Sequence, residues 1–315
     1  MKKHFKKRST TGKADSKPTI IVDCSALAYA SKYAYGVLSY NGESTGVIYG
    51  FLKKVLSLAK RFDTNKFIFC WDSGGETVRM KSYPNYKKRR REKQKLMTPE
   101  EKNEIKEVVS QRETLRRLIL PAIGFQNSFG VPGFEGDDII AYFVNKLHSK
   151  RELLILSPDS DMYQLLDRAN QIIKKPKKKE SVFTKDHLLK KFGVRPDQWP
   201  YAKAIGGCSG DGVEGIKGVS DPKNVSSKAL KYILGTLTKG VIFDRIETKR
   251  SERIIKRNIG LVTIPHNDLN QRMIIRRDQF KASYLILVFD RLRFRSFIDE
   301  DQFKHWRKYF GDQHG

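Results

Sequence analysis

Cysteine is scarce in this sequence, and its scarcity limits both the kind of fold and the cellular compartment. The 315 residues contain only Cys24, Cys70 and Cys208, an odd number at wide spacing. A small disulfide-stapled scaffold needs more cysteines in pairs, so that class is excluded. Sparse cysteines are typical of a reducing compartment, and we therefore expect a cytoplasmic protein, in the host-cell cytoplasm if the sequence is viral.

Long apolar runs are also missing. No stretch reaches the roughly 20 apolar residues that cross a bilayer as a helix, and the N-terminus lacks the apolar core of a secretory signal. We therefore expect no membrane span and no membrane partner. With 39% apolar and 31% charged residues, the composition is that of a globular protein, in one large domain or two fused ones.

Acidic residues are few relative to basic ones. Asp and Glu number 35 against 62 Lys and Arg, which gives a net charge of +27. This imbalance predicts a polyanionic partner, with nucleic acid ahead of an acidic membrane surface. Residues 1–17 are basic and almost free of apolar side chains. They predict a disordered basic arm, which either contacts nucleic acid or is a plain solvated tail.

Several of the acids nevertheless lie at the ends of apolar runs. Runs at 19–23, 66–72 and 153–161 finish in aspartate, and residues 46–62 carry apolar positions at helical spacing. Strands alternating with helices predict an open, mostly parallel α/β sheet, whose ligand site lies beyond the carboxyl ends of the strands. The aspartates that would project from this edge are Asp23, Asp72, Asp159 and Asp161.

Three carboxylates crowd one short stretch, at Glu135, Asp137 and Asp138, just before an apolar run at 139–144. A helix N-terminus would relieve their repulsion by only about 0.3–1 kcal/mol per group. A hard divalent cation would offset far more, since oxygen-only clusters suit magnesium, calcium or manganese. The alternative is an acidic cap on a solvated surface. Three strands that also end in aspartate favour the metal interpretation.

Two further segments carry nucleic-acid signals. Residues 82–93 are dense in Lys and Arg, with Tyr83 and Tyr86 among them, and a polar helical pattern continues to 117. This predicts an exposed helical excursion that binds phosphates and stacks on unpaired bases, the alternative being a solvated charged helix. Residues 206–219 contain six glycines and precede a helical pattern at 226–234. Backbone N–H groups in such turns can approach a phosphate backbone without reading bases.

From about Thr19 to Val262, the chain resembles the 5′ nuclease superfamily of flap endonucleases, bacterial DNA polymerase 5′ nuclease domains and phage 5′–3′ exonucleases. The resemblance is carried by the order and spacing of four segments, at 134–138, 157–161, 86–90 and 207–219. It implies a PIN-like α/β sheet, a helical arch at about 82–118 and a helix–three-turn–helix at about 200–235. The implied domains are 18–180 for the nuclease sheet and 181–315 for a helical DNA-binding region.

The resemblance also implies roles for individual residues. The implied ligands of two Mg²⁺ or Mn²⁺ ions are Asp23, Asp72, Glu135 and Asp137 for the first, Asp138 near the bridge, and Asp159, Asp161 and Asp211 for the second. Lys87 is implied as the active-site lysine, Arg90 as a phosphate-binding arginine and Tyr86 as a base-stacking tyrosine. The remaining implied DNA contacts are Lys88, Arg89, Gly215, Lys217, Gly218 and Lys228. A potassium ion at the glycine-rich segment is a further implication.

The chain departs from the family pattern at the glycine-rich segment. Where the family usually has Gly-Asp-x-x-Asp-Asn, this chain has Cys208 in place of one acid and Gly212 in place of the asparagine. A neutral thiol is a poor magnesium ligand, so the second ion is expected to bind more weakly. Restoring the acid with Cys208→Asp is expected to tighten the magnesium requirement, and an unchanged metal titration would contradict this.

Together these features predict a metal-dependent 5′ nuclease, acting on DNA with a 5′ flap or 5′ end, or on an RNA–DNA hybrid, as a monomer. A role in replication or primer removal follows from the resemblance alone. Two other classes stay open. A non-catalytic junction-binding protein would keep the basic arch and the glycine-rich segment, and a ribonuclease of the PIN type would share the sheet and the acids but lack both of these segments.

Overall fold

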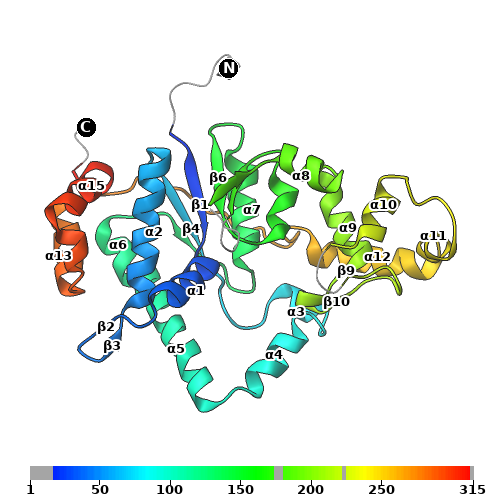
Figure 1. Cartoon of the computed structure of the whole chain (residues 1–315), viewed down its shortest axis with the longest axis horizontal. Coiled ribbons are helices and arrows are strands. Elements are labelled where there is room, and N and C mark those ends of the chain that lie inside the picture. The colour runs from blue at the N-terminus through cyan, green and yellow to red at the C-terminus, as the bar shows by residue number, and fades with distance from the viewer. Residues whose placement is uncertain (1–16, 174–179, 222–224, 313–315) are drawn as a thin grey trace, which may run out of the picture.

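The computed structural model describes residues 17–173, 180–221 and 225–312. The predicted basic arm at 1–17 therefore lies outside the described residues, except for Lys17. A twisted central sheet lies between layers of helices, and a helical extension carries the glycine-rich segment away from it (Figure 1). None of the helices in the described ranges combines the length and the apolar character that a bilayer crossing requires.

The sheet has six strands in the order β5-β4-β1-β6-β7-β8. Neighbours from β5 to β7 are parallel, and β8 alone runs antiparallel to its neighbour. The strands are β1 (Thr19–Asp23), β4 (Phe67–Cys70), β5 (Ser128–Phe129), β6 (Leu153–Leu156), β7 (Asn170–Ile173) and β8 (Ser181–Phe183). The predicted mostly parallel α/β sheet is confirmed, because apolar runs such as Ile20-Ile21-Val22 bury both faces of a central strand.

Successive residues of β1 point to opposite faces and build two separate cores. Ile20 and Val22 join a cluster with α2 (Gly46–Phe62), whereas Ile21 joins a cluster with α7 (Gly136–Leu147). The helix predicted at 46–62 is therefore confirmed. On the same side as α2 lies α1 (Cys24–Tyr35), whose C-terminal end leads into the small hairpin of β2 (Ser39–Tyr40) and β3 (Glu43–Ser44).

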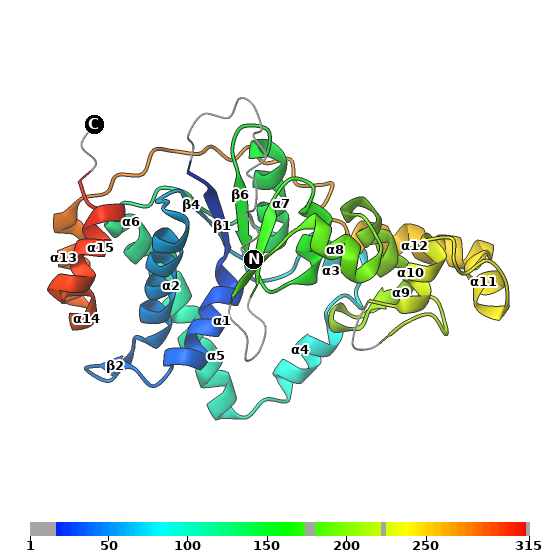
Figure 2. The same cartoon turned by 45° about the horizontal axis from the view of Figure 1, so that its top comes forward.

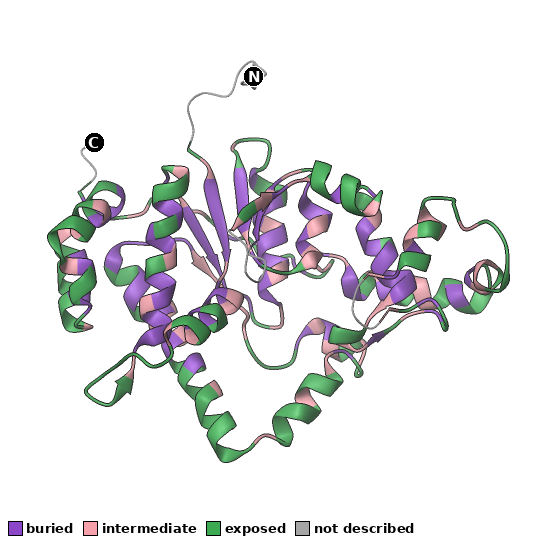
Figure 3. Ribbon diagram, viewed as in Figure 1, coloured by how far each residue is buried: buried purple, intermediate pink, exposed green. Residues whose placement is uncertain are grey.

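An exposed helical excursion follows β4, as predicted. After the short α3 (Val78–Ser82), α4 (Lys88–Lys95) and α5 (Pro99–Thr114) form the two sides of a V that extends away from the sheet (Figures 1 and 3). No residue of α4 is buried. A Thr98–Glu101 capping box starts α5 cleanly, and a π-helical turn (Leu115–Ile119) and α6 (Leu120–Ile123) return the chain to the core.

The glycine-rich segment is held in a group of short elements. In chain order these are α8 (Lys185–Phe192), α9 (Trp199–Gly206), β9 (Gly207–Cys208), β10 (Val213–Glu214), α10 (Ser227–Ile233), α11 (Val241–Ile246) and α12 (Lys249–Val262). The two-stranded ribbon β9–β10 folds the glycine-rich chain back on itself, and α12 packs against α9. A helix–turn–helix arrangement around 200–235 was predicted, and α9 and α10 are the two helices that pack together there.

The C-terminal helices do not belong to this group. From Thr263 the chain runs along the top of the view in Figure 2 to α13 (Ala282–Arg291), α14 (Arg295–Ile298) and α15 (Glu300–Phe310), which pack beside α2 and α6. Phe289, Trp306 and Phe310 complete the same core as Ile20. The predicted division at 181 is therefore wrong for 280–310, because the aromatic residues of this segment bury themselves against the sheet domain.

Candidate active site

Seven carboxylates gather at the carboxyl edge of the sheet. They come from the ends of β1, β4 and β6, from the N-terminus of α7 and from the glycine-rich segment, and they line one pocket of about 260 Å³. The carboxylates are Asp23, Asp72, Glu135, Asp137, Asp159, Asp161 and Asp211. Lys87 and Arg90, at the base of α4, lie along the same pocket. The structure thus brings together residues spread over nearly 190 positions, as parallel strands require of their shared edge.

Local hydrogen bonds fix the carboxylates at the strand ends. Asp23 caps α1, since its Oδ1 accepts from the Ala26 N–H at 3.0 Å, and its Oδ2 accepts from the Ser157 hydroxyl at 2.9 Å. Asp72 accepts from the Gly136 N–H at 2.7 Å, which ties the end of β4 to the first turn of α7. Both aspartates therefore accept a backbone N–H from a neighbouring helix, and the Ser157 hydroxyl also orients Asp23.

The carboxylates repel one another strongly. Burial, with the charges of Asp72 and Asp159, raises the pKa of Asp23 to about 6, although hydrogen bonds oppose the rise. Burial first, and then Asp159, Asp23 and Asp72, raise the pKa of Asp137 well above its usual range. Such a pocket stabilises a bound cation, and its donors are all oxygens, which fit a hard divalent ion.

Basic side chains partly neutralise this charge. Among the residues described, no three His, Cys, Asp or Glu side chains already stand as a ready ligand set. Instead Lys87 Nζ lies 2.5 Å from Glu135 Oε1, and Arg90 Nη2 lies 3.2 Å from Asp211 Oδ1. A metal ion would therefore bind as these cations move away from the acids.

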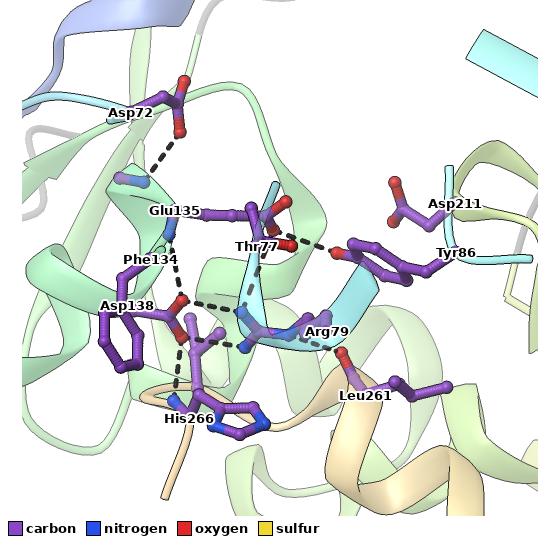
Figure 4. Close-up of polar contacts among 12 residues, drawn as sticks. Asp72, Thr77, Arg79, Tyr86, Phe134, Glu135, Asp138, Asp211, Leu261 and His266 are labelled. Carbon is purple, nitrogen blue, oxygen red and sulfur yellow. Dashed lines mark hydrogen bonds and ion pairs between the residues drawn. The ribbon is translucent and has the colours of Figure 1, made fainter. Parts of the chain in front are cut away.

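Tyr86 is buried, with 4% of its surface exposed, and its hydroxyl donates to Glu135 Oε2 at 2.9 Å (Figure 4). Its ring is covered by Lys87, whose Nζ lies 5.1 Å from the ring centroid. The prediction that Tyr86 stacks on a base is therefore wrong, because no open face of the ring is available. It holds Glu135 instead.

Asp138 lies outside the pocket, completely buried beneath it. Its two oxygens pair with the Arg79 guanidinium at 2.6 and 2.8 Å, and they also accept from the backbone N–H groups of His266 and Glu135 (Figure 4). The prediction that Asp138 ligates metal near a bridge is wrong, because neighbouring residues of a helix point about 100° apart. Asp137 faces the pocket, and Asp138 faces the protein interior.

The acids fall into two clusters, a first of Asp23, Asp72, Glu135 and Asp137 and a second of Asp159, Asp161 and Asp211. The second has a buried basic partner of its own. Lys203, on α9, forms an ion pair with Asp161, and burial raises the pKa of Asp161 to about 6 in spite of this pair. The Cys208 thiol donates to Asp211 Oδ2 at 3.3 Å. Burial raises the pKa of Cys208 to about 12, opposed by Lys203, so the thiol stays neutral at physiological pH. The donor set for a second magnesium ion is correspondingly poor.

The base of the arch is joined directly to the glycine-rich segment. Lys87 N–H donates to the Asp211 carbonyl at 2.7 Å, and Arg90 Nε donates to the Gly210 carbonyl at 3.1 Å. Gly212 has φ +67°, and a Cβ there would lie 2.5 Å from the Asn85 carbonyl oxygen. The substitution of glycine for the family's asparagine therefore has a physical reason, namely the close approach of the arch.

The predicted DNA contacts fall into two places. Lys88, Arg89 and Gly215 line a groove of about 760 Å³ between the arch base and the glycine-rich segment. Farther along, Lys228 Nζ donates to the Gly218 carbonyl at 2.6 Å, and the Lys217 carbonyl accepts from Arg245.

Three residues that support the site were not predicted from the sequence. Arg79 also bonds the carbonyls of Leu261 and Thr263, so it anchors the end of α12 beneath the acids. Ser157 orients Asp23, and Lys203 neutralises Asp161. A charged residue inside the otherwise apolar sequence Trp199–Gly206 was the available signal for Lys203. Nothing in the local sequence distinguishes Arg79 from the other basic residues around it.

The mostly parallel sheet, the acid pocket at its edge and the helical arch whose base lines that pocket define a PIN-like nuclease fold. Residues 18–193 match the model of the family described as 5′-3′ exonuclease, N-terminal resolvase-like domain, and the chain belongs to this family. The resemblance predicted from the sequence is confirmed.

Relatives and solved structures agree with this assignment. A 5′-3′ exonuclease of Aquifex aeolicus is 35% identical over 69% of this chain and 70% of its own length. DNA polymerase I of Deinococcus radiodurans is 33% identical over 71% of this chain, which spans only 22% of that polymerase. The T5 5′-exonuclease with bound zinc has a TM-score of 0.65 at 22% identity, covering 79% of this chain and 90% of its own. At that identity the structural likeness concerns the fold.

Proposed function

We propose that this chain is a divalent-metal-dependent 5′ nuclease, which hydrolyses phosphodiesters near the junction of a 5′ single strand with duplex DNA. It would act as both 5′–3′ exonuclease and flap endonuclease, in replication or primer removal. The observation that carries the proposal is the carboxylate pocket at the sheet edge, whose lining includes Lys87 and Arg90 from the base of the basic arch. The names of the relatives and the net charge of +27 support it.

The first cluster offers the donors that a Mg²⁺ or Mn²⁺ ion prefers. Asp23, Asp72, Glu135 and Asp137 would hold it, and a second ion would bind more weakly among Asp159, Asp161 and Asp211. When bound, such ions supply an activated water and stabilise the charge on the leaving oxygen. The divalent ions in the T5 5′-exonuclease support metal dependence.

The chain's own residues bind and orient the phosphate. Lys87 and Arg90 would exchange their carboxylate partners for the scissile phosphate and offset its developing negative charge. Tyr86 would keep Glu135 in place while Lys87 moves, because its hydroxyl donates to the other oxygen of the same carboxylate. No protein nucleophile is needed.

Duplex DNA would lie along the groove between the arch base and the glycine-rich segment. Lys88 and Arg89 would contact phosphates there, and Gly215, which lines the same groove, would offer its backbone. Beyond the groove, Lys217, Gly218 and Lys228 would continue the contact. A potassium ion at the glycine-rich segment is part of the proposal on the family resemblance alone. To bind the Gly218 carbonyl, it would have to displace the Lys228 ammonium.

The test is incision of an end-labelled 5′-flap duplex in magnesium, beside the same duplex with a 3′ flap. We expect cuts near the 5′ junction that EDTA abolishes and that the 3′-flap duplex does not show. An RNA–DNA hybrid with a 5′ end tests the second substrate class, and gel filtration tests the proposed monomer. Cleavage without metal, or equal cleavage of both flaps, would contradict the proposal.

A non-catalytic junction-binding protein is the second candidate, and the neutral Cys208 in the second cluster is the observation that favours it. Such a protein would bind the 5′-flap duplex tightly and leave it intact in magnesium and manganese alike. A PIN-type ribonuclease is less well supported, since that class lacks an arch and a glycine-rich helical segment. A cytoplasmic location remains part of the proposal, supported by the sparse cysteines.

A further inference from the structure

Among the described residues, two lysines pair with the clustered acids. Lys87 comes from the base of the arch, and Lys203 does not. It lies on α9 between buried neighbours, with 8% of its surface exposed. Its ammonium pairs with Asp161, whose side chain is 15% exposed. A lysine this deeply buried needs its carboxylate partner, because moving its charge elsewhere in the interior would leave it unpaired.

The carboxylates around Lys203 are already engaged. Asp211 forms an ion pair with Arg90 and accepts a hydrogen bond from the Cys208 thiol, and Asp161 forms an ion pair with Lys203. Asp159 is the member of the cluster to which the described residues give no ion pair, and its Oδ1 accepts from the Asp161 N–H at 2.8 Å. The Arg90 side chain is 61% exposed and free to follow a phosphate, whereas that of Lys203 is 10% exposed. Arg90 can therefore leave the second cluster to bind a phosphate, whereas Lys203 remains paired with Asp161.

Charge counting separates the two clusters. With every carboxylate ionised, the first cluster sets four of them (Asp23, Asp72, Glu135 and Asp137) against the ammonium of Lys87. Arg79 also lies 3.9 Å from Glu135, but Asp138 balances its charge, so three negative charges remain. In the second, three carboxylates face Lys203 and Arg90, which leaves one. An aspartate at position 208 would add a second negative charge, whereas the cysteine there donates its thiol proton to Asp211 and brings no carboxylate. A divalent ion therefore gains much more from the first cluster than from the second.

We propose that Lys203 is the resident cation of the second cluster and competes with the second divalent ion for Asp161. The protein then binds one divalent ion tightly at the first cluster, and a second one only when Lys203 withdraws. This inference rests on the proposed function, since it concerns the ions of the same site. It extends the effect of Cys208, because the missing acid and the lysine both act to lower the affinity of the second ion.

Binding of Mn²⁺ to the metal-free, full-length protein, followed by the electron paramagnetic resonance signal of free Mn²⁺, tests the proposal without relying on activity. The wild type is compared with Lys203→Met, with the double variant Lys203→Met/Cys208→Asp, and with Lys54→Met. The last removes a lysine that pairs with Glu180 and does not line the acid pocket, and it serves as the matched control. Circular dichroism melting establishes that each variant is folded.

We expect one tight and one much weaker Mn²⁺ in the wild type and in Lys54→Met. Lys203→Met should tighten the weaker site about tenfold or more, with the tight site unchanged, and the double variant should tighten it further. Two equivalent sites in the wild type, or a weak site unmoved by Lys203→Met, would overturn the proposal. Flap incision by the wild type is measured in parallel. Absent incision would contradict the proposed nuclease function, whereas the Mn²⁺ titration alone decides the role of Lys203.

Discussion

Glu135 is held from two directions by consecutive residues at the base of the arch. The Tyr86 hydroxyl donates to one oxygen and the Lys87 ammonium to the other. Because Tyr86 is buried and Lys87 is partly open to the pocket, the tyrosine supplies the fixed contact and the lysine the exchangeable one. The orientation of Glu135 therefore depends on a buried tyrosine from the base of the arch.

Tyr86→Phe tests this positioning role. Removing the hydroxyl should lower metal affinity or incision by about 10–100-fold, as is usual for partners of a metal ligand. Stability should fall by only about 0.5–1.5 kcal/mol, the net value of one hydrogen bond. Mn²⁺ titration measures the metal affinity, single-turnover kinetics measure the incision rate, and urea unfolding measures the stability. Tyr83→Phe is the control, and equal effects of the two variants would contradict the role.

The Arg79–Asp138 pair is a buried ion pair beneath the pocket. Arg79→Met leaves an uncompensated carboxylate, so it should cost about 3–5 kcal/mol in urea unfolding. Adding Asp138→Asn to that variant should recover part of the loss, as a double-mutant cycle would show.

The opposite result is also defined. If Asp138→Ala abolished incision with unchanged stability, Asp138 would be a site residue after all, and the structural role would be wrong.

At the scale of elements, the contact between the arch and the glycine-rich segment depends on Gly212. Gly212→Ala should place a Cβ against the Asn85 carbonyl and separate the two segments. We expect a loss of about 1–3 kcal/mol in stability and weaker binding to a 5′-flap duplex. Gly235→Ala is a matched control, since Gly235 has the same φ of +67° and no atom within 4 Å of its Cβ position. Equal effects of both variants would mean that backbone strain, and not the arch contact, is responsible.

Elements with a strong hydrophobic pattern could be predicted from the sequence. β1 and α2 were predicted with their observed bounds, because apolar residues at strand or helix spacing leave few alternatives. The bond between Arg90 and the Gly210 carbonyl joins residues 120 positions apart and has no local signal. The packing of α13–α15 against α2 was missed for the same reason. Asp138 was misplaced because one residue of rotation along a helix decides whether a side chain faces a pocket or the interior.

At the scale of the whole molecule, the acid pocket lowers stability at neutral pH when no metal is bound. The pKa values of Asp23 and Asp161 are raised to about 6, above the usual value near 3.8. The stability that these groups contribute is therefore complete below about pH 4 and is lost as the pH rises through about 6. Asp278, whose pKa burial also raises to about 6, adds the same trend at the opposite edge of the sheet.

Thermal melting of the metal-free protein at pH 5 and pH 7.5 measures this effect. Asp23→Asn should raise Tm at pH 7.5 by a few degrees and change it little at pH 5, whereas magnesium should stabilise the wild type chiefly at pH 7.5. Asp278→Asn should likewise raise Tm at pH 7.5 more than at pH 5, and it should leave the stabilisation by magnesium unchanged. An Asp23→Asn protein less stable than the wild type at pH 7.5 without metal would contradict the electrostatic account.

The central claim is that the carboxylates at the sheet edge cleave DNA that the arch and the glycine-rich segment bind. Asp137→Asn separates these functions most directly, because Asp137 faces the pocket and neither the arch nor the glycine-rich segment supplies it. Incision of a labelled 5′-flap duplex in magnesium and binding of the same duplex in EDTA are measured together, with Asp186→Asn on the exposed start of α8 as control. We predict that Asp137→Asn abolishes incision and binds the duplex at least as tightly as the wild type. Normal incision by this variant would contradict the account.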